Sequence, residues 1–259
     1  MNRIASTSQI LPNWPAPKNI KAFSSTRFGG VSTGVYQGLN LGMHVGDDSN
    51  AVQTNRDQIQ HDNAMPTAPV WLNQTHSTDV IELFKPTKQV LDADGSTTKH
   101  KKIVCCVMTA DCLPVLLTNT DGTQVAAVHA GWRGLVDGIL EKAVQQFSKP
   151  SQVMAWIGPA IGANSFEVGE DVYHQFLDHD PNAKDGFVVY KKKHHKTSIQ
   201  KPEKKWLANM SILATQRLNQ AGVEQVYDSQ RCTYSESDIF YSYRRDGITG
   251  RQASFIWME

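Results

Sequence analysis

Three short apolar runs between residues 104 and 129 constrain the fold of this chain more than any other feature. VCCVMT (104–109) and LPVLLT (113–118) are typical of buried strands, and QVAAVH (124–129) is a third such run. Between the second and third runs, NTDG (119–122) favours a tight hairpin. The middle of the chain therefore predicts buried β-structure.

Helical periodicity begins directly after the third run. The segment AGWRG (130–134) interrupts the strand, and apolar residues then recur at helical spacing from Leu135 to Phe147. This pattern predicts one helix that starts near Gly134 and ends before Pro150. VMAWIG (153–158) then predicts a return to the sheet.

Further elements complete the predicted pattern. Helices are expected over Val168–Leu177 and Glu203–Ala221, and FSSTRFGGVSTGVYQGLNLG (23–42) is typical of short strands joined by tight turns. Hairpins combined with a strand–helix–strand unit predict an α+β fold, in which mixed β-sheets pack together with helices on the outside. No linker rich in proline, serine or glycine divides the chain, so we expect a single domain over residues 1–259.

Composition narrows the class of protein. The formal net charge of +1 gives no reason to expect nucleic acid or an anionic membrane as partner. No apolar run approaches the roughly 20 residues that span a bilayer, and the N-terminal segment lacks the apolar core of a signal peptide. Three of the four cysteines fall within Cys105–Cys112, which is too clustered for a disulfide framework. Together these features predict a cytoplasmic protein.

Three residues with metal-ligand chemistry stand at or just past the ends of apparent strands. They are His76 in NQTHS, Cys112 in TADC and His129 at the end of VAAVH. Catalytic zinc commonly takes three protein ligands and keeps a fourth position for water, so two imidazoles and a thiolate satisfy the count. Adjacent Asp111 could orient a ligand or act as a general base, or it could simply cap a turn.

The same residues admit other chemistry. Cys112 could be a buried free thiol beside hydrogen-bonded histidines, or it could pair with a histidine as a nucleophile, as in thiol hydrolases. Two histidines and a cysteine are also the core of a blue-copper site. A multicopper oxidase, however, needs clustered histidines, and the nine histidines of this chain include no His-X-His pair.

Arginines set among glycines suggest a pocket for a small, planar, partly anionic molecule. Arg133 opens a predicted helix, where free backbone N–H groups also attract anions. In the C-terminal loop YSYRRDGITGR (241–251), Arg245 is one of three candidate arginines, and Phe166 could stack on a planar ring. Further polar candidates lie in other small-residue segments: Arg27, Asn40 and Glu167.

These motifs occur in the order of one family. STRFGGVSTGVYQGLNLG, NQTHS, TADCLPVLL, VHAGWRG, IGPAIGANSFEVG and YSYRRDGITGR resemble the YfiH/YlmD family of laccase-domain proteins. That family is also described as purine nucleoside phosphorylases or peptidoglycan editing factors. The resemblance runs from about residue 20 to the C-terminus and implies an α+β fold with His76, Cys112 and His129 as metal ligands. The first ligand departs slightly from the family's QVHG context, since it stands here in QTHS.

The resemblance implies a zinc-dependent purine nucleoside enzyme, with copper as a possible alternative metal. Its expected reactions are phosphorolysis of adenosine, inosine or methylthioadenosine to base plus ribose 1-phosphate, and deamination of adenosine to inosine. Arg133 and an arginine of the C-terminal loop would bind phosphate, while Asp111, Cys112 and His129 would form the catalytic group. We expect small-molecule partners only, in a monomer or weak homo-oligomer.

Three other functions stay open at this point. One is a copper-dependent polyphenol oxidase of the laccase type. Another is a Cys–His hydrolase that edits a peptidoglycan precursor. The last is a metal-stabilised protein that binds a muropeptide or another protein without catalysis.

Overall fold

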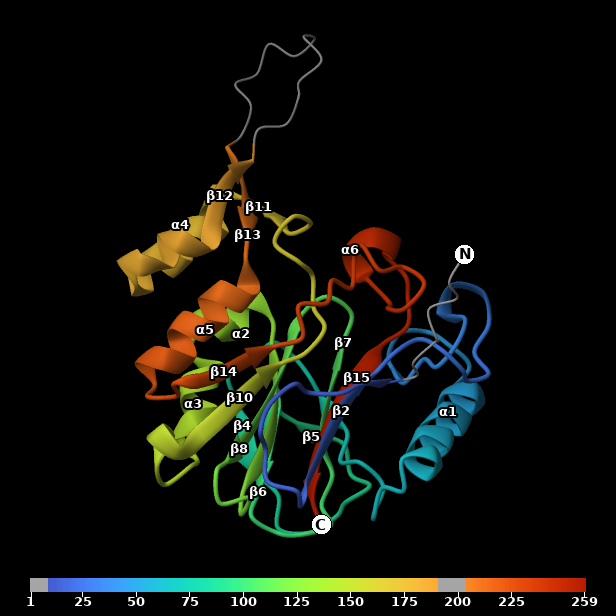
Figure 1. The fold of residues 1–259 in the computed structure, drawn as a ribbon. Helices are drawn as coiled ribbons and strands as arrows, with labels where there is room; N and C mark the ends of the chain where they lie inside the picture. The colour runs from blue at the N-terminus through green and yellow to red at the C-terminus, as the bar shows by residue number, and fades with distance from the viewer. Residues whose placement is uncertain (1–8, 191–203) are drawn as a thin grey trace, which may run out of the picture.

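Two large β-sheets face each other in the computed structural model, which describes residues 9–190 and 204–259 (Figure 1). The six-stranded sheet has the order β14 (Gln225–Asp228), β10 (Val153–Ile157), β8 (Leu113–Asn119), β9 (Val125–Ala130), β6 (Gly95–Thr98) and β4 (Val80–Glu82). The four-stranded sheet has the order β1 (Gln9–Ile10), β2 (Ile20–Ser25), β15 (Gln252–Met258) and β7 (Cys105–Thr109). The strands β7, β8, β9 and β10 are buried along nearly their whole length, which is why they are apolar runs rather than alternating patterns.

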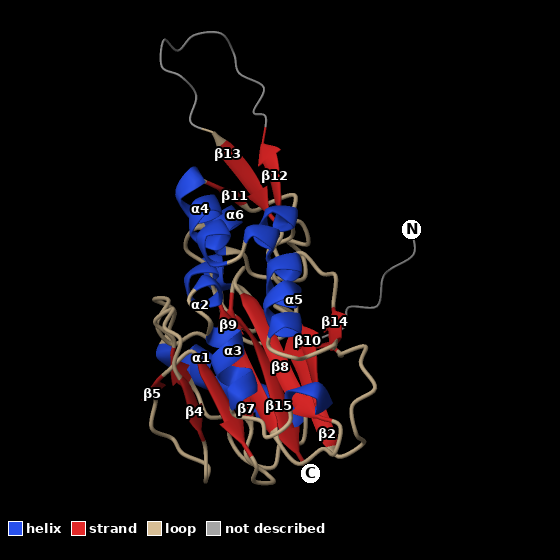
Figure 2. Ribbon diagram, turned by 90° about the vertical axis from the view of Figure 1, so that its left-hand side faces the viewer, coloured by secondary structure: helices blue, strands red, loops and turns tan. Residues whose placement is uncertain are grey.

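Alternation of side chains along the strands separates the core into layers. On β7, Cys105 and Val107 point between the two sheets, whereas Cys106 and Met108 join the core beneath α1 (Ser49–Asp62). The opposite face of the six-stranded sheet packs against helices α2 (Trp132–Val136), α3 (Ile139–Gln145) and α5 (Met210–Gln220) (Figures 1 and 2). The fold is therefore a sandwich of two sheets with helices outside, and the predicted α+β class is confirmed.

The chain changes sheet between two of the predicted strands. β7 belongs to the four-stranded sheet and β8 to the six-stranded sheet, so residues 110–112 cross from one to the other. β8 and β9 then pair antiparallel, with Leu117 opposite Ala126, across a turn in which Gly122 has a φ of 64°. The predicted hairpin is confirmed. The crossing places Asp111 and Cys112 at the end of the seam between the sheets.

The single helix predicted from Gly134 to Pro150 is wrong, because the structure has two helices there. α2 ends at Val136, and Gly138 adopts a φ of 92° before α3 begins at Ile139. This left-handed conformation is easy for glycine and ends the first helix. The second helix thereby turns its apolar side chains onto the sheet.

The helix predicted over 203–221 is too long. Residue 203 lies outside the described residues, and Lys205–Ala208 forms strand β13 between β11 (Glu167–Val168) and β12 (Phe187–Tyr190). Burial alternates along β13 with the period of two that a strand requires. α5 begins only at Met210, where the side chain of Asn209 accepts a hydrogen bond from the amide of Ile212.

The expected helix near residue 170 forms, whereas most of the short strands expected over residues 23–42 do not. α4 covers Glu170–His179, so it begins and ends two residues later than the helix predicted over Val168–Leu177. Of the expected N-terminal strands, only β2 is longer than two residues, and the glycine-rich segment folds as loops around a 3₁₀ turn. The remaining elements are β3 (Leu72–Asn73), β5 (Leu91–Asp92), α6 (Tyr243–Asp246) and the 3₁₀ turns Gly34–Tyr36, Pro150–Gln152 and Pro181–Gly186. Among the described residues, no helix has the length and apolar character to cross a membrane.

Candidate metal centre

The three predicted metal ligands meet at one end of the two-sheet sandwich. His129 stands near the end of β9, Cys112 lies where the chain enters β8, and His76 lies in the loop after β3. One potential ligand atom from each residue lies within 4.8 Å of the other two, and Sγ of Cys112 is 3.7 Å from Nε2 of His76. The imidazole rings of His76 and His129 meet edge to face with centroids 4.8 Å apart. The tertiary structure thus gathers side chains that are 17 to 53 positions apart in sequence.

A fully buried carboxylate, Asp94, stands behind both histidines. Its Oδ1 accepts hydrogen bonds from Nδ1 of His129 at 2.7 Å and from the amide of His76 at 3.0 Å. Its Oδ2 accepts from the amides of Thr75 and Ser77 and from the Ser77 hydroxyl, at 2.7–3.1 Å. Because Nδ1 of His129 is engaged, Nε2 is the ring atom left to bind a metal.

The loop that carries His76 fits only against glycines. His76 itself has a φ of 62°, an uncommon conformation for a residue with a side chain. A Cβ at Gly131 would lie 2.5 Å from Cδ2 of His76 and 3.3 Å from Sγ of Cys112. A Cβ at Gly134 would lie 2.9 Å from the carbonyl oxygen of Ser77. Both glycines of GWRG therefore let α2 approach the ligand loop.

Electrostatics at the cluster favour a thiolate. Burial raises the pKa of Cys112, but the facing imidazoles of His129 and His76 outweigh it and lower the pKa to about 6. Burial lowers the pKa of His129, yet the thiolate of Cys112 and the carboxylate of Asp94 raise it to about 9. The site thus already supplies the anionic sulfur that a metal requires.

The donor set fits a transition metal. Two imidazoles and one thiolate suit zinc with an open coordination position, and they also suit copper. Within residues 9–190 and 204–259, these side chains form the one group of three or more potential ligands. The hydroxyl of Thr109 is buried beside them without a protein partner, and an orphaned hydroxyl of this kind fits a polar occupant.

Two cavities open on either side of Cys112. The first, here called the metal lobe, has a volume of about 260 Å³, and His44, Gln74 and Arg251 line it together with the three ligands. The second, here called the aromatic lobe, has about 190 Å³, and its walls include Trp132, Phe166, Arg244 and Asp111. Ala110, Cys112 and Tyr243 border both lobes. The cluster therefore stands between a cavity bordered by Arg251 and a cavity walled by Trp132 and Phe166.

Charge in the two lobes follows from burial and neighbours. In the metal lobe, burial and then the charge of Arg251 lower the pKa of His44. In the aromatic lobe, the guanidinium of Arg244 lies 5.1 Å from the ring centre of Phe166. An arginine over an aromatic ring makes a flat, polarisable surface on which a planar ligand can lie.

Asp111 lies at the floor of the aromatic lobe. Its carboxylate accepts hydrogen bonds from the hydroxyl of Thr233 at 2.6 Å and from the amide of Arg244 at 2.7 Å. Burial raises its pKa, against the lowering effect of these donors. Its φ is 108°, which is strained for a residue other than glycine. Asp111 thus ties three loops together while it borders the cavity.

The predicted arginines lie in different surroundings. Arg133 is exposed on α2, where its guanidinium covers the ring of Trp132 at 4.4 Å, and it borders neither lobe. Arg245 donates to the carbonyl oxygens of Thr233, Tyr234 and Phe240 and pairs with Asp246. The structure therefore does not gather these two arginines around the metal ligands.

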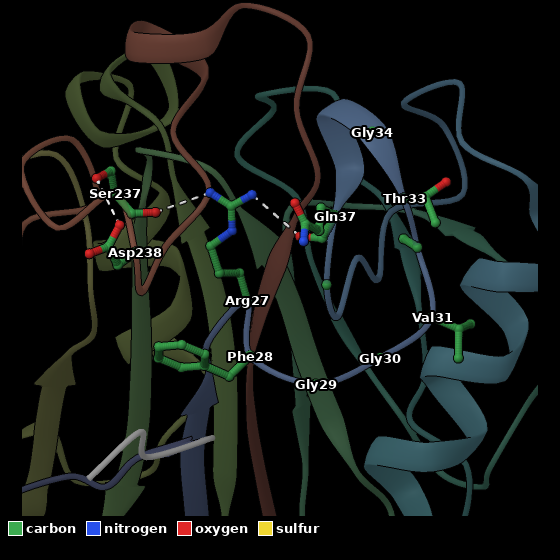
Figure 3. A pocket seen from close by; sticks show the side chains of 12 residues that line it. Arg27, Phe28, Gly29, Gly30, Val31, Thr33, Gly34, Gln37, Ser237 and Asp238 are labelled. Carbon is green, nitrogen blue, oxygen red and sulfur yellow. Dashed lines mark hydrogen bonds between the residues drawn. The ribbon is translucent and has the colours of Figure 1, made fainter. Parts of the chain in front are cut away.

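Arg27 lines another cavity, of about 830 Å³, among glycines of the N-terminal loops (Figure 3). Its guanidinium bridges two loops by donating to the carbonyl oxygens of Ser237 at 3.0 Å and Gln37 at 3.3 Å. Glycine is required in the wall, since a Cβ at Gly38 would lie 2.0 Å from the carbonyl oxygen of Arg27.

Asn40 and Glu167 also hold loops in place. Asn40 is fully buried, and its Oδ1 accepts from the amides of Gly42 and Arg251. The backbone carbonyl of Glu167 accepts from the guanidinium of Arg244 at 2.9 Å. Both residues thus contact an arginine that does line a lobe.

Sequence patterns did not indicate that Asp94, His44 and Gln74 belong to the site. For the phosphate-binding arginine of the C-terminal loop, they favoured Arg245 over Arg251. Asp94 stands in LDADGS, where an Asp-Gly pair is typical of a plain turn. Gln74 pairs its side-chain amide with the backbone of Met108, and its only signal was its place two residues before His76. Nothing in the C-terminal loop distinguished Arg251 from its neighbours.

The fold and the ligand cluster define a laccase-like domain with one His–Cys–His site. The chain belongs to the family described as multi-copper polyphenol oxidoreductase laccase, which residues 21–259 match. The resemblance to YfiH/YlmD proteins is thereby confirmed.

Individual relatives span nearly the same length. A Haemophilus influenzae protein named purine nucleoside phosphorylase is 50% identical over 96% of this chain and 99% of its own. The Escherichia coli purine nucleoside phosphorylase YfiH is 47% identical over 96% and 98%. A solved Neisseria meningitidis structure, 45% identical, superimposes with a TM-score of 0.88 over 98% of this chain and 100% of that chain. YlmD from Geobacillus stearothermophilus, 27% identical, gives 0.83 over 99% and 98%.

Proposed function

We propose that the protein is a zinc-dependent purine nucleoside phosphorylase that also deaminates adenosine. The observation that carries the proposal is the position of the His76–Cys112–His129 cluster, between the metal lobe, which Arg251 borders, and the aromatic lobe. A nucleoside and phosphate need such a pair of cavities, one for a flat base and one for an anion. The names of the relatives, purine nucleoside phosphorylase, support the phosphorolytic activity.

The purine binds in the aromatic lobe. Phe166 and the guanidinium of Arg244 provide a stacking surface, and Trp132 closes another wall. The buried carboxyl of Asp111 faces the heteroatoms of the base. Its raised pKa suits a group that delivers a proton to N7 of the purine.

Phosphate binds in the metal lobe. Arg251 is the arginine that borders this lobe, and His44 lies beside it. A guanidinium binds two phosphate oxygens at once, and the orphaned hydroxyl of Thr109 supplies a further donor. On this geometry Arg251, rather than exposed Arg133, is the phosphate-binding arginine.

Phosphorolysis needs no reactant other than the nucleoside and phosphate. A phosphate oxygen forms a bond to C1′ of the ribose as the C1′–N9 bond of the nucleoside breaks, and the departing purine takes a proton, which we assign to Asp111. His76, Cys112 and His129 would hold a zinc ion, which would supply Lewis acidity when bound. In deamination, water replaces the amino group at C6 and ammonia leaves.

The test is turnover by purified, metal-replete protein. Adenosine with phosphate should yield adenine and ribose 1-phosphate, and adenosine without phosphate should yield inosine. Cys112→Ala should abolish both products, while His61→Ala, at an exposed histidine away from the site, should change neither. Absence of both products, with wild type and Cys112→Ala alike, contradicts the proposal.

A thiol hydrolase is the second candidate, because Cys112, His129 and Asp94 lie in the order of a nucleophile, a base and an orienting carboxylate. It would cleave an amide, such as one in a peptidoglycan precursor. An alkylating agent should then label Cys112 and abolish amide cleavage without removing metal. A tightly bound zinc that protects Cys112 contradicts this candidate.

Copper-dependent phenol oxidation is the third candidate, favoured by the description of the matching family. It requires that copper occupy the same ligands. Phenol oxidation should vanish in copper-free, zinc-loaded protein and return with copper. Oxidation that persists without copper contradicts it.

A further inference from the structure

The carboxylate of Asp94 is the contact that the two histidine ligands share. It is 0% exposed and accepts five hydrogen bonds from four residues. Three successive amides, those of Thr75, His76 and Ser77, converge on it from one loop. The fourth residue, His129, belongs to β9 and approaches from the other side. One buried anion thus fixes two ligands that are far apart in sequence.

We propose that Asp94 is a positioning residue that sets both the place of His76 and the tautomer of His129 in the metal centre. The inference rests on the metal site of the proposed function, although it does not depend on the substrate. Buried carboxylates behind metal-binding histidines fix the ring and raise its basicity, and their loss typically weakens metal binding about 10- to 100-fold.

The place of His76 follows from the convergent amides. A left-handed residue flanked by amides that point to one centre forms a cradle for an anion, and here the anion is Asp94. Without the negative charge, these amides would face a buried side chain that no longer accepts all of their hydrogen bonds. The loop would then lose the hydrogen bonds that hold His76 at a φ of 62°.

The tautomer of His129 follows from the hydrogen bond to Nδ1. With Asp94 as acceptor, Nδ1 keeps its proton, so Nε2, which faces Cys112 and His76, is the nitrogen whose lone pair would bind a metal. The backbone adds a second link, since the amide of His129 donates to the carbonyl of Asp94 at 2.7 Å. This backbone bond survives any substitution at Asp94, so the carboxylate can be tested separately.

Asp94→Asn is the informative substitution because the amide has the same shape but only one acceptor atom. Whichever way it is turned, its NH₂ group faces at least two N–H donors: those of His129 and His76, or those of Thr75 and Ser77. In the first orientation, His129 must move its proton to Nε2 and lose its metal lone pair. In the second, the His76 loop loses its cradle.

The experiment measures affinity for zinc and for cobalt(II) by competition with a chromophoric chelator. We expect Asp94→Asn to weaken both about 10- to 100-fold and to alter the thiolate–cobalt absorption band. Asp79→Asn, at an exposed carboxylate next to the same loop, is the matched control and should stay within twofold of wild type. An affinity within threefold of wild type with an unchanged cobalt spectrum overturns the proposal, as does a wild-type protein that binds neither metal.

A second measurement needs no variant, in case Asp94→Asn fails to fold. Nitrogen-15 chemical shifts of the zinc-loaded wild type should show His129 protonated at Nδ1 and coordinated through Nε2. Coordination through Nδ1 overturns the proposal. If metal binding depends on Asp94 but no nucleoside is turned over, the proposed function fails while this inference stands. If nucleosides are turned over but metal binding does not depend on Asp94, this inference fails while the proposed function stands.

Discussion

Gly131 lies directly against the imidazole of His76, so close that a Cβ would come within 2.5 Å of Cδ2. This contact joins two motifs that are 55 positions apart in the sequence. It explains why the strand that delivers His129 is followed at once by glycine. The backbone at the start of α2 forms one wall of the metal centre.

Gly131→Ala should therefore displace His76 without touching a ligand chemically. Overpacking of this kind costs about 1–3 kcal/mol, and here it also moves a ligand atom. We expect at least a tenfold loss of zinc affinity, measured by chelator competition. Gly169→Ala is the control, because the nearest neighbour of its Cβ is the exposed side-chain carboxylate of Asp171, far from the cluster in sequence, and its metal affinity should be unchanged. Equal zinc affinities of Gly131→Ala and Gly169→Ala would contradict the proposed role of Gly131 in the placement of His76.

Arg251→Gln should raise the KM for phosphate and spare the KM for adenosine. Hydrogen bonds to a charged group contribute about 1.5–3 kcal/mol, which corresponds to roughly a 10- to 100-fold change. Arg133→Gln should change neither constant by more than twofold, because Arg133 borders neither lobe. Steady-state kinetics with each substrate varied in turn provides the check. A phosphate effect at Arg133 alone would restore the assignment expected from sequence.

Phe166→Ala should have the complementary effect. Stacking of a base on an aromatic ring contributes about 1–3 kcal/mol, so the KM for adenosine should rise roughly 5- to 150-fold while that for phosphate stays constant. Phe84→Ala, at an exposed phenylalanine with 66% of its surface accessible, is the matched control. An unchanged adenosine KM would place the purine elsewhere.

Thiol reactivity should divide the four free cysteines into two classes. Burial raises the pKa of Cys105 to about 12 and that of Cys106 higher still, so both thiols stay protonated near pH 8. Both side chains are also buried and thus inaccessible to a reagent in the folded protein. Iodoacetamide should label them only after unfolding. In native, metal-free protein it should label Cys112 and Cys232, and zinc should protect Cys112 alone. Peptide mass spectrometry reads the outcome; native labelling of Cys105 would contradict it.

Sequence patterns succeeded where local order decides the structure. The three apolar runs became β7, β8 and β9, and the Asp-Gly turn became their hairpin, because strand length and turn chemistry are local properties. The patterns failed at Lys205–Ala208, where they predicted a helix. These residues form β13 because they pair with β11 and β12, and pairing with distant segments cannot be predicted from the periodicity of one segment.

The candidate ligand residues follow from the sequence, but their arrangement does not. His76, Cys112 and His129 were identified from residue type, strand ends and family motifs. Only the tertiary structure decided that the two histidines share one carboxylate, since Asp94 reaches them through β6 pairing with β9 and through the loop after β3. It also decided which arginine lines the metal lobe, because the choice between Arg133, Arg245 and Arg251 depends on how loops pack over a sheet end. Local patterns specify chemistry and elements, whereas hydrogen bonds and contacts between distant segments specify which side chains meet.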